Sequence, residues 1–158
     1  MGEPKKRSSR RSKTQTEWLS QRRTTLVVDT DGRGFVDITG RVLAWLDEIG
    51  AGEGLLTVFV RHTSASLTIQ ENADPDVRTD LLDMLERLAP ENAGYRHTIE
   101  GPDDMPAHIK SMLTSVSLSI PVVAGRSALG TWQGIYLVEH RQKPHRRTVI
   151  LHFVGTVR

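Results

Sequence analysis

Five side chains that commonly bind metal ions or move protons gather in one short segment, HTIEGPDDMPAH at 97–108. They are His97, Glu100, Asp103, Asp104 and His108. Imidazoles with carboxylates nearby are typical of zinc ligands and of the groups that orient them. The spacing matches no standard zinc motif such as HExxH, and two surface histidines beside an Asp-Asp helix cap are the alternative. Because so dense a cluster needs a common reason, we favour a metal site.

A second polar segment, RHTSAS at 61–66, directly follows the apolar run at 55–60. Its hydroxyls can donate hydrogen bonds to phosphate oxygens, and a neutral imidazole can bind a metal or carry a proton. A strand-end turn in which Ser and Thr satisfy backbone groups is the alternative. The spacing does not decide between these two interpretations.

A third candidate segment, GTWQG at 130–134, leads into a strand. Trp132 either stacks on a planar ring or fills the core, which is the usual role of tryptophan. Gln133 and Glu139 share one face of this strand, and Glu139 follows two apolar neighbours, so we expect it to meet a cation. Asn72 stands just before a predicted helix start, where a bound anion is favourable.

Composition excludes several classes of protein. The chain has 158 residues and no cysteine, which excludes disulfide scaffolds, cysteine zinc sites, iron–sulfur clusters and thiol nucleophiles. The sequence contains no phosphate-binding P-loop, no dinucleotide-binding GxGxxG and no GxSxG elbow. No apolar run approaches the ~20 residues that a membrane-spanning helix needs, so we expect no membrane insertion. The lack of cysteine fits a reducing compartment, and we expect a cytoplasmic protein.

The charge is divided unevenly along the chain. Residues 1–23 hold eight basic and two acidic side chains, a net charge of +6, whereas 13 basic and 17 acidic residues give the remainder −4. Residues 1–15 are polar and have no apolar h-region, so we predict a disordered tail rather than a secretory signal. Such a tail can contact nucleic acid, although a solvated extension is the simpler interpretation.

Hydrophobic patterning predicts one α+β domain over 24–158, preceded by the tail at 1–23. Strands are predicted at 24–30, 55–60, 67–69, 117–123, 130–140 and 147–154. Helices are predicted at 37–50, 74–88 and, as a short third one, 106–114. The second helix is expected to bury the stripe Val77, Leu81, Met84, Leu85 and Leu88. Because the late strands follow one another directly, we expect a compact fold with a mostly antiparallel sheet.

Three motifs in one order carry a family resemblance: HTSASLTIQENADPDVRTD, YRHTIEGPDDMPAHIKSML and GTWQGIYLVEHR. They strongly resemble the YjbQ family, also named secondary thiamine-phosphate synthase, and the match covers roughly 24–155. Gln70 departs from the usual asparagine, and the loop at 143–145 replaces a shorter glycine-rich one. Neither departure removes a candidate ligand.

The resemblance implies an α+β fold that assembles as a homotrimer, with a pocket near the subunit boundary. It also implies a site for a divalent metal, zinc or magnesium, on His62, His97 and His108. Asp103, Asp104 and Glu139 match acidic family positions and are expected to orient ligands or transfer protons. The implied reaction joins an aminopyrimidine diphosphate to a thiazole phosphate and releases diphosphate.

A small phosphorylated substrate would then contact a further set of polar and aromatic residues. This set comprises Arg61, Thr63, Ser64, Ser66, Asn72, Trp132, Gln133 and Arg141. Two other functions remain open from the sequence. One is a metal-dependent hydrolase, since zinc can activate a water molecule. The other is a non-catalytic trimeric binding protein whose basic tail contacts nucleic acid.

Overall fold

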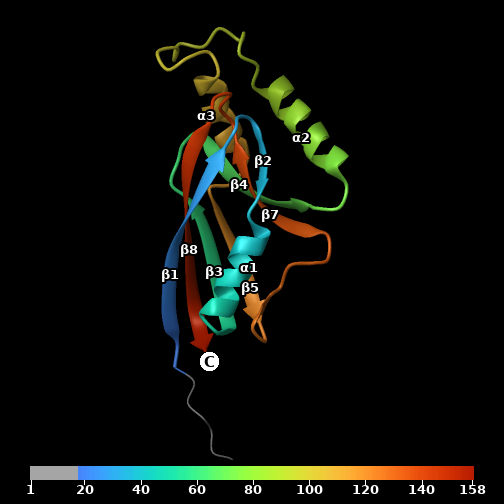
Figure 1. Ribbon diagram of the computed structural model, residues 1–158. Helices are drawn as coiled ribbons and strands as arrows, with labels where there is room; N and C mark the ends of the chain where they lie inside the picture. Colours follow the sequence, from blue (N-terminus) through green and yellow to red (C-terminus); the bar gives the residue numbers. More distant parts are fainter. Residues whose placement is uncertain (1–17) are drawn as a thin grey trace, which may run out of the picture.

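A computed structural model describes residues 18–158, which form eight strands and three helices (Figure 1). The strands are β1 (Ser20–Thr30), β2 (Gly34–Asp37), β3 (Ala51–Val60), β4 (Ala65–Glu71), β5 (Ser117–Val123), β6 (Arg126–Ser127), β7 (Gln133–Glu139) and β8 (His145–Val157). The helices are α1 (Thr39–Glu48), α2 (Pro75–Leu88) and α3 (Asp104–Leu113). None of the helices in this part of the chain is long and apolar enough to cross a membrane.

The strands form two sheets in which every pairing is antiparallel. The larger sheet has the order β1-β8-β3-β5-β6, and the smaller one has the order β2-β7-β4. Alternate side chains of β3 and β8 point into one core that also receives β7 and α1, and Val58, Leu151, Leu137 and Val42 are fully buried there. The predicted α+β class with antiparallel strands is therefore confirmed, but the strands divide between two sheets.

The first strand begins earlier than the pattern predicted. Ser20 pairs with Gly155 and Arg23 with His152, so residues 20–23 belong to β1 rather than to the basic tail. The hydrophobic pattern did not predict this part of the strand, because Gln21, Arg22 and Arg23 are exposed, polar residues on an edge strand. The proposed nucleic-acid contact of residues 1–15 lies outside the described residues.

Helix α2 differs most from its expectation. Its start is as predicted: Asp74 accepts a hydrogen bond from the Asp76 backbone N at 2.9 Å, and Pro75 opens the helix. The prediction that its apolar stripe is buried is wrong, because no residue of α2 is buried and Met84 is 47% exposed. Figure 1 shows α2 standing away from the two sheets.

The two connections that carry polar motifs lie at the same end of the sheets. The link 61–64 joins β3 to β4, and the link 140–144 joins β7 to β8. Because β4 and β7 are antiparallel, Ala65 at the start of one pairs with Glu139 at the end of the other. Helix α3 packs against β4, so the N-terminal end of α3 meets these two links.

Candidate metal centre

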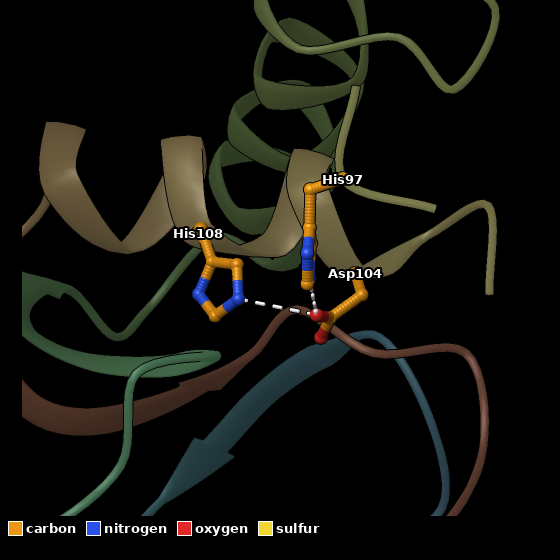
Figure 2. A group of neighbouring side chains, drawn as sticks. All are labelled: His97, Asp104 and His108. Atoms are coloured by element: carbon orange, nitrogen blue, oxygen red, sulfur yellow. Dashed lines mark hydrogen bonds and ion pairs between the residues drawn. The ribbon is translucent and has the colours of Figure 1, made fainter. Parts of the chain in front are cut away.

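Two histidines converge on one carboxylate oxygen at the start of α3 (Figure 2). His97 Nε2 lies 2.7 Å from Asp104 Oδ2, and His108 Nε2 lies 3.1 Å from the same oxygen. Asp104 and His108 are four residues apart on α3, a spacing that places two side chains on one helix face. His97 arrives from the loop that joins α2 to α3. The three ligand atoms lie within 4.8 Å of one another, close enough to surround one ion.

The contact made by Nδ1 of His108 shows which ring nitrogen carries a proton. His108 Nδ1 lies 3.0 Å from the carbonyl oxygen of Thr63. A carbonyl only accepts, so Nδ1 carries the proton, and Nε2 of a neutral ring then presents a lone pair. That lone pair faces Asp104 Oδ2, which is also an acceptor. Either a second proton or a cation must separate the two atoms.

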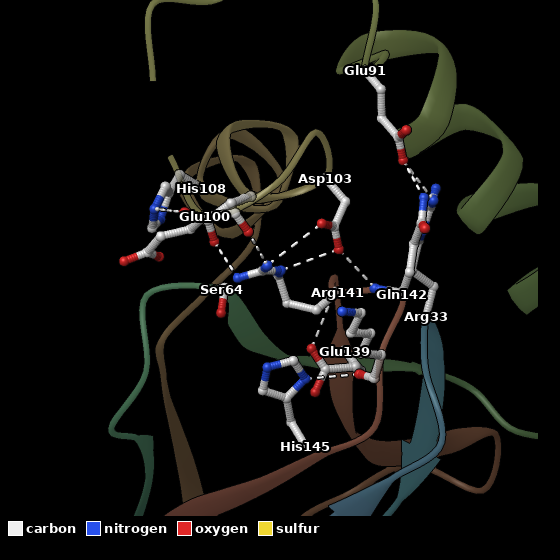
Figure 3. Close-up of polar contacts among 12 residues, drawn as sticks. Arg33, Ser64, Glu91, Glu100, Asp103, His108, Glu139, Arg141, Gln142 and His145 are labelled. Atoms are coloured by element: carbon white, nitrogen blue, oxygen red, sulfur yellow. Dashed lines mark hydrogen bonds and ion pairs between the residues drawn. The ribbon is translucent and has the colours of Figure 1, made fainter. Parts of the chain in front are cut away.

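Arg141, in the link after β7, binds Asp103 (Figure 3) and also Asp104. Its Nε donates to Asp103 Oδ2 at 3.1 Å, its Nη2 donates to the Glu100 carbonyl at 2.8 Å, and its Nη1 donates to Asp104 Oδ1. Burial raises the pKa of Asp103 and of Asp104, but hydrogen bonds and the Arg141 charge outweigh it, and each pKa is lowered. Both groups are therefore ionised at neutral pH.

Glu139 meets the cation that its position predicted, but it is not placed for chemistry. Its carboxylate is 0% exposed and forms an ion pair with Arg147, whose Nε lies 2.7 Å from Glu139 Oε2. Thr30 Oγ1 and the Arg141 backbone N also donate to it. Burial raises the pKa of Glu139, but these donors outweigh it and lower the pKa. In the single chain, Glu139 therefore has a structural role in place of the proton-transfer role that we expected.

His62 lies apart from the His97–Asp104–His108 group. Its Nε2 accepts a hydrogen bond from the Thr148 backbone N at 2.8 Å, and burial followed by the Arg147 charge lowers its pKa. The single chain thus assembles two histidines and Asp104, rather than three histidines, as its candidate ligands. The neighbouring residues Arg61, Thr63 and Ser64 line a cavity together with His62.

Ser66 is closed to substrate in the single chain. Its side chain is 0% exposed and its Oγ lies 2.8 Å from Nε2 of His140. Burial, followed by the charge of Lys110, lowers the pKa of His140 to about 4, so the ring is neutral at physiological pH. The Ser66–His140 pair therefore fills the core rather than serving as a nucleophile and base. Neither His140 nor Arg147 was predicted, because their roles depend on contacts with Ser66 and Glu139 in the core that the sequence does not show.

Three expected substrate contacts lie at the opposite end of the smaller sheet. Gln133 pairs with Glu71 at one end of β4 and β7, whereas Glu139 pairs with Ala65 at the other. Six residues of strand separate the two ends, about 20 Å. Trp132 and Asn72 flank the Gln133 end, where Asn72 N donates to the Trp132 carbonyl at 3.0 Å. Trp132 is 63% exposed and does not fill the core.

A cavity opens directly beside His97. Its volume is about 490 Å³, and Asn92, Tyr95 and Thr98 line it together with His97. The volume falls within the range of small-molecule sites. Tyr95 is therefore the aromatic side chain that accompanies the metal-type cluster in the single chain, a role that the sequence analysis gave to Trp132.

Comparison with known proteins agrees with the fold and the motifs. The family model described as UPF0047 protein YjbQ-like matches residues 24–156. A UPF0047 protein of Synechocystis sp. is 56% identical over 133 residues, which are 84% of this chain and 90% of that protein. The UPF0047 protein YjbQ of Escherichia coli O157:H7 is 45% identical over 132 residues, 83% of this chain and 96% of that protein.

A solved structure extends the agreement to the fold. The crystal structure of a YbjQ-like protein of unknown function from Sulfolobus solfataricus P2 superposes with a TM-score of 0.82. The alignment covers 87% of this chain and 99% of that protein, at 23% sequence identity. At this identity the likeness concerns the arrangement of strands and helices.

The buried Glu139–Arg147 pair leads to a stability prediction. Replacing Glu139 by Gln leaves the buried Arg147 guanidinium without its counter-charge, and we expect a loss of about 3–5 kcal/mol in the free energy of unfolding. Urea denaturation at pH 7 measures this loss. The matched control is Asp29→Asn, which removes the exposed pair with Arg146 and should cost less than about 1 kcal/mol.

The same pair predicts a pH dependence. Because the folded pKa of Glu139 is lowered, its contribution is present above the unfolded pKa of about 4.3 and is lost as the pH falls further. The stability difference between the wild type and Glu139→Gln should stay constant from neutral pH to about pH 5 and shrink below it. An equal cost for Glu139→Gln and Asp29→Asn would contradict the assignment.

Proposed function

The chain belongs to the YjbQ-like UPF0047 family, and we propose that it is a divalent-metal-dependent transferase of the thiamine-phosphate synthase type. It joins an aminopyrimidine diphosphate to a thiazole phosphate and releases diphosphate. One observation supports the metal: His97 Nε2 and His108 Nε2 both face one oxygen of Asp104, and the three atoms are close enough to surround one ion. In our proposal a cation at this point takes the place of the protons that would otherwise link the two imidazoles to the carboxylate.

The chemistry of the ligands favours zinc over magnesium. Two imidazole nitrogens and one carboxylate oxygen suit zinc and related transition metals. Magnesium prefers oxygen ligands throughout and keeps several waters. The hydrogen bond from His108 Nδ1 to the Thr63 carbonyl is the kind of contact that orients a metal-binding imidazole. The residues present therefore fit a zinc ion on His97, Asp104 and His108.

When bound, a divalent ion withdraws electron density from a phosphate oxygen and stabilises the departing diphosphate. Arg141 offsets the charge of Asp103 and Asp104, so that two carboxylates beside the site do not repel an anionic substrate. Asp103 also accepts from the Gln142 backbone N at 2.9 Å, which fixes the link that carries Arg141. The cavity beside His97 and Tyr95 receives the ring of the diphosphate substrate.

A metal-dependent hydrolase is the second candidate. The same ligand set supports it, because two histidines and one carboxylate leave a zinc position open to water. The two functions differ in what attacks the substrate, a thiazole nitrogen or a water molecule. They share the metal centre and are separated by the second experiment below.

Metal content tests the proposed ligands. We expect purified wild-type protein to bind about one zinc ion per chain, and His97→Ala or Asp104→Asn to bind less than about a tenth of that, because each removes one of three ligands. Elemental analysis after dialysis against zinc measures the content. His152→Ala is the matched control, since the His152 ring lies on β8 and hydrogen-bonds Gln21 of β1, away from the proposed ligands. Full zinc content in His97→Ala would refute the site.

Diphosphate release tests the reaction. With zinc and both thiamine precursors present, we expect diphosphate and thiamine phosphate in equal amounts, and no diphosphate from the aminopyrimidine diphosphate alone. His97→Ala should lower the rate by at least about a hundredfold, since the charge on the leaving group is no longer offset. Release of diphosphate without the thiazole phosphate would instead indicate the hydrolase. Zinc-loaded protein that releases none under either condition would contradict both.

We also propose that the protein is a homo-oligomer, in accord with the expected trimer. The support comes from α2, whose apolar stripe is only partly covered within the described residues. A groove of about 330 Å³ runs along this stripe and is lined by Phe35, Leu81, Met84 and Leu113 among others. Ion pairs hold α2 instead: Glu86 binds both Lys110 and Arg33. A second copy of the chain would cover the stripe.

Met84→Glu tests this assembly. Met84 is 47% exposed in the single chain, so the change should cost the folded monomer little, while a charge in an apolar interface should dissociate it. Light scattering after gel filtration measures the mass. Asp83→Ala, on the same helix, is expected to keep the wild-type mass. A wild type that is monomeric, or a Met84→Glu variant of unchanged mass, would contradict the proposal.

A further inference from the structure

A second cavity, apart from the one beside His97, opens at the end of β3. Its volume is about 610 Å³, and its polar wall consists of the link 61–64 together with Arg147. Phe59 and Val116 form an apolar wall. The link is shared with the metal centre, because the carbonyl of Thr63 accepts the hydrogen bond from His108. A molecule in this cavity therefore lies next to the proposed zinc ligands.

The polar wall supplies donors and no carboxylate. His62 Nε2 accepts from the Thr148 backbone N, so the proton of the neutral ring is on Nδ1. Nδ1 has no hydrogen-bond partner among residues 18–158. The hydroxyl of Ser64 accepts from Arg147 Nη2 at 3.0 Å, which leaves its own proton free to donate.

The two arginines of the wall differ in their freedom. Arg147 is 4% exposed, and its Nε and Nη2 are engaged with Glu139 and Ser64. The side chain of Arg61 is exposed and forms no ion pair with any described residue. Arg61 can therefore turn its full charge to a ligand, while Arg147 is fixed and holds the Ser64 hydroxyl in place.

From these donors we infer that the cavity binds the phosphate group of a phosphate monoester. A guanidinium, an imidazole N–H and hydroxyls on one wall match a group with several acceptor oxygens and two negative charges. The apolar wall of Phe59 and Val116 suits the organic part of the same molecule. Resting on the proposed function, the ligand is the thiazole phosphate, and the diphosphate substrate occupies the metal centre.

This division explains how one site can handle two phosphorylated molecules. The diphosphate needs a multivalent cation because its charge grows as it departs. The monoester phosphate only anchors its substrate, for which a guanidinium and neutral donors are enough. The Thr63 carbonyl and the His108 ring join the two sites, so the reacting rings can meet between them.

Inorganic phosphate is the probe for this cavity. In full-length zinc-loaded protein, we expect phosphate to shift the ring resonances of His62 in a saturable titration followed by NMR. Arg61→Gln should weaken phosphate binding at least about tenfold, the usual cost of losing a charged hydrogen-bond donor. Arg146→Gln is the control, since it removes the same charge from an exposed pair with Asp29. Equal affinities for the two variants, or no shift of the His62 resonances, would overturn the inference.

A second variant separates this inference from the proposed reaction. In His97→Ala, zinc content should fall while phosphate still shifts the His62 resonances with the wild-type affinity. Loss of phosphate binding in His97→Ala would place the phosphate on the metal and refute the cavity. In the transferase assay, Arg61→Gln should raise the KM for the thiazole phosphate about tenfold and leave that for the diphosphate substrate unchanged. The titration stands even if the transferase assay shows no turnover.

Discussion

The buried carboxylate of Glu139 joins the two sheets at the end where the candidate site lies. Glu139 is the last residue of β7 in the smaller sheet, whereas its partners Arg147 and Thr30 belong to β8 and β1 of the larger one. The backbone N of Arg141 supplies a further donor. An ionised group with no exposed surface is tolerable only when several donors surround it. The fold therefore fixes the ends of three strands around one charge.

The arrangement of the candidate metal centre follows from this pair. Arg147 holds the hydroxyl and the carbonyl of Ser64, which fixes the link 61–64. The adjoining carbonyl of Thr63 then receives His108 Nδ1–H, which orients the ring so that Nε2 faces Asp104 Oδ2. Glu139 meanwhile accepts from the backbone N of Arg141, whose guanidinium reaches Asp103 (Figure 3) and also Asp104. Asp104 and His108 are thus oriented by contacts that begin at a buried charge.

Much of this could be predicted from local spacing, and the failures concern contacts between distant segments. The four-residue interval between Asp104 and His108 places both on one helix face, so their proximity follows from the helix itself. An acidic residue at the end of an apolar strand correctly indicated a cation, although not which one. The place of His62 depends on a hydrogen bond to Thr148, 86 residues away, and no sequence period encodes that pairing.

The sequence also could not show which of these side chains are accessible. Ser66 and Ser64 belong to one hydroxyl-rich motif and both are buried, yet Ser66 points toward His140 in the core while Ser64 lines a cavity. Their separation by two residues would place them on one face of a strand, but Ser64 precedes β4 and escapes that alternation. The predicted burial of the apolar stripe of α2 was wrong for a different reason. Its 3.6-residue period shows that an apolar face exists, and cannot show whether the same chain covers it.

The carboxylate of Asp104 limits how an ion can be held. Its Oδ1 accepts from Arg141 and its Oδ2 faces both histidines, so only one oxygen is available as a ligand. A single carboxylate oxygen with two imidazole nitrogens gives three ligands, and three protein ligands would leave a zinc ion at this site open to a substrate. Had Arg141 been absent, both oxygens could turn to the ion and the set would suit a larger, oxygen-seeking cation. If the proposed ion binds, Arg141 would thus bear on the choice of metal as well as on charge.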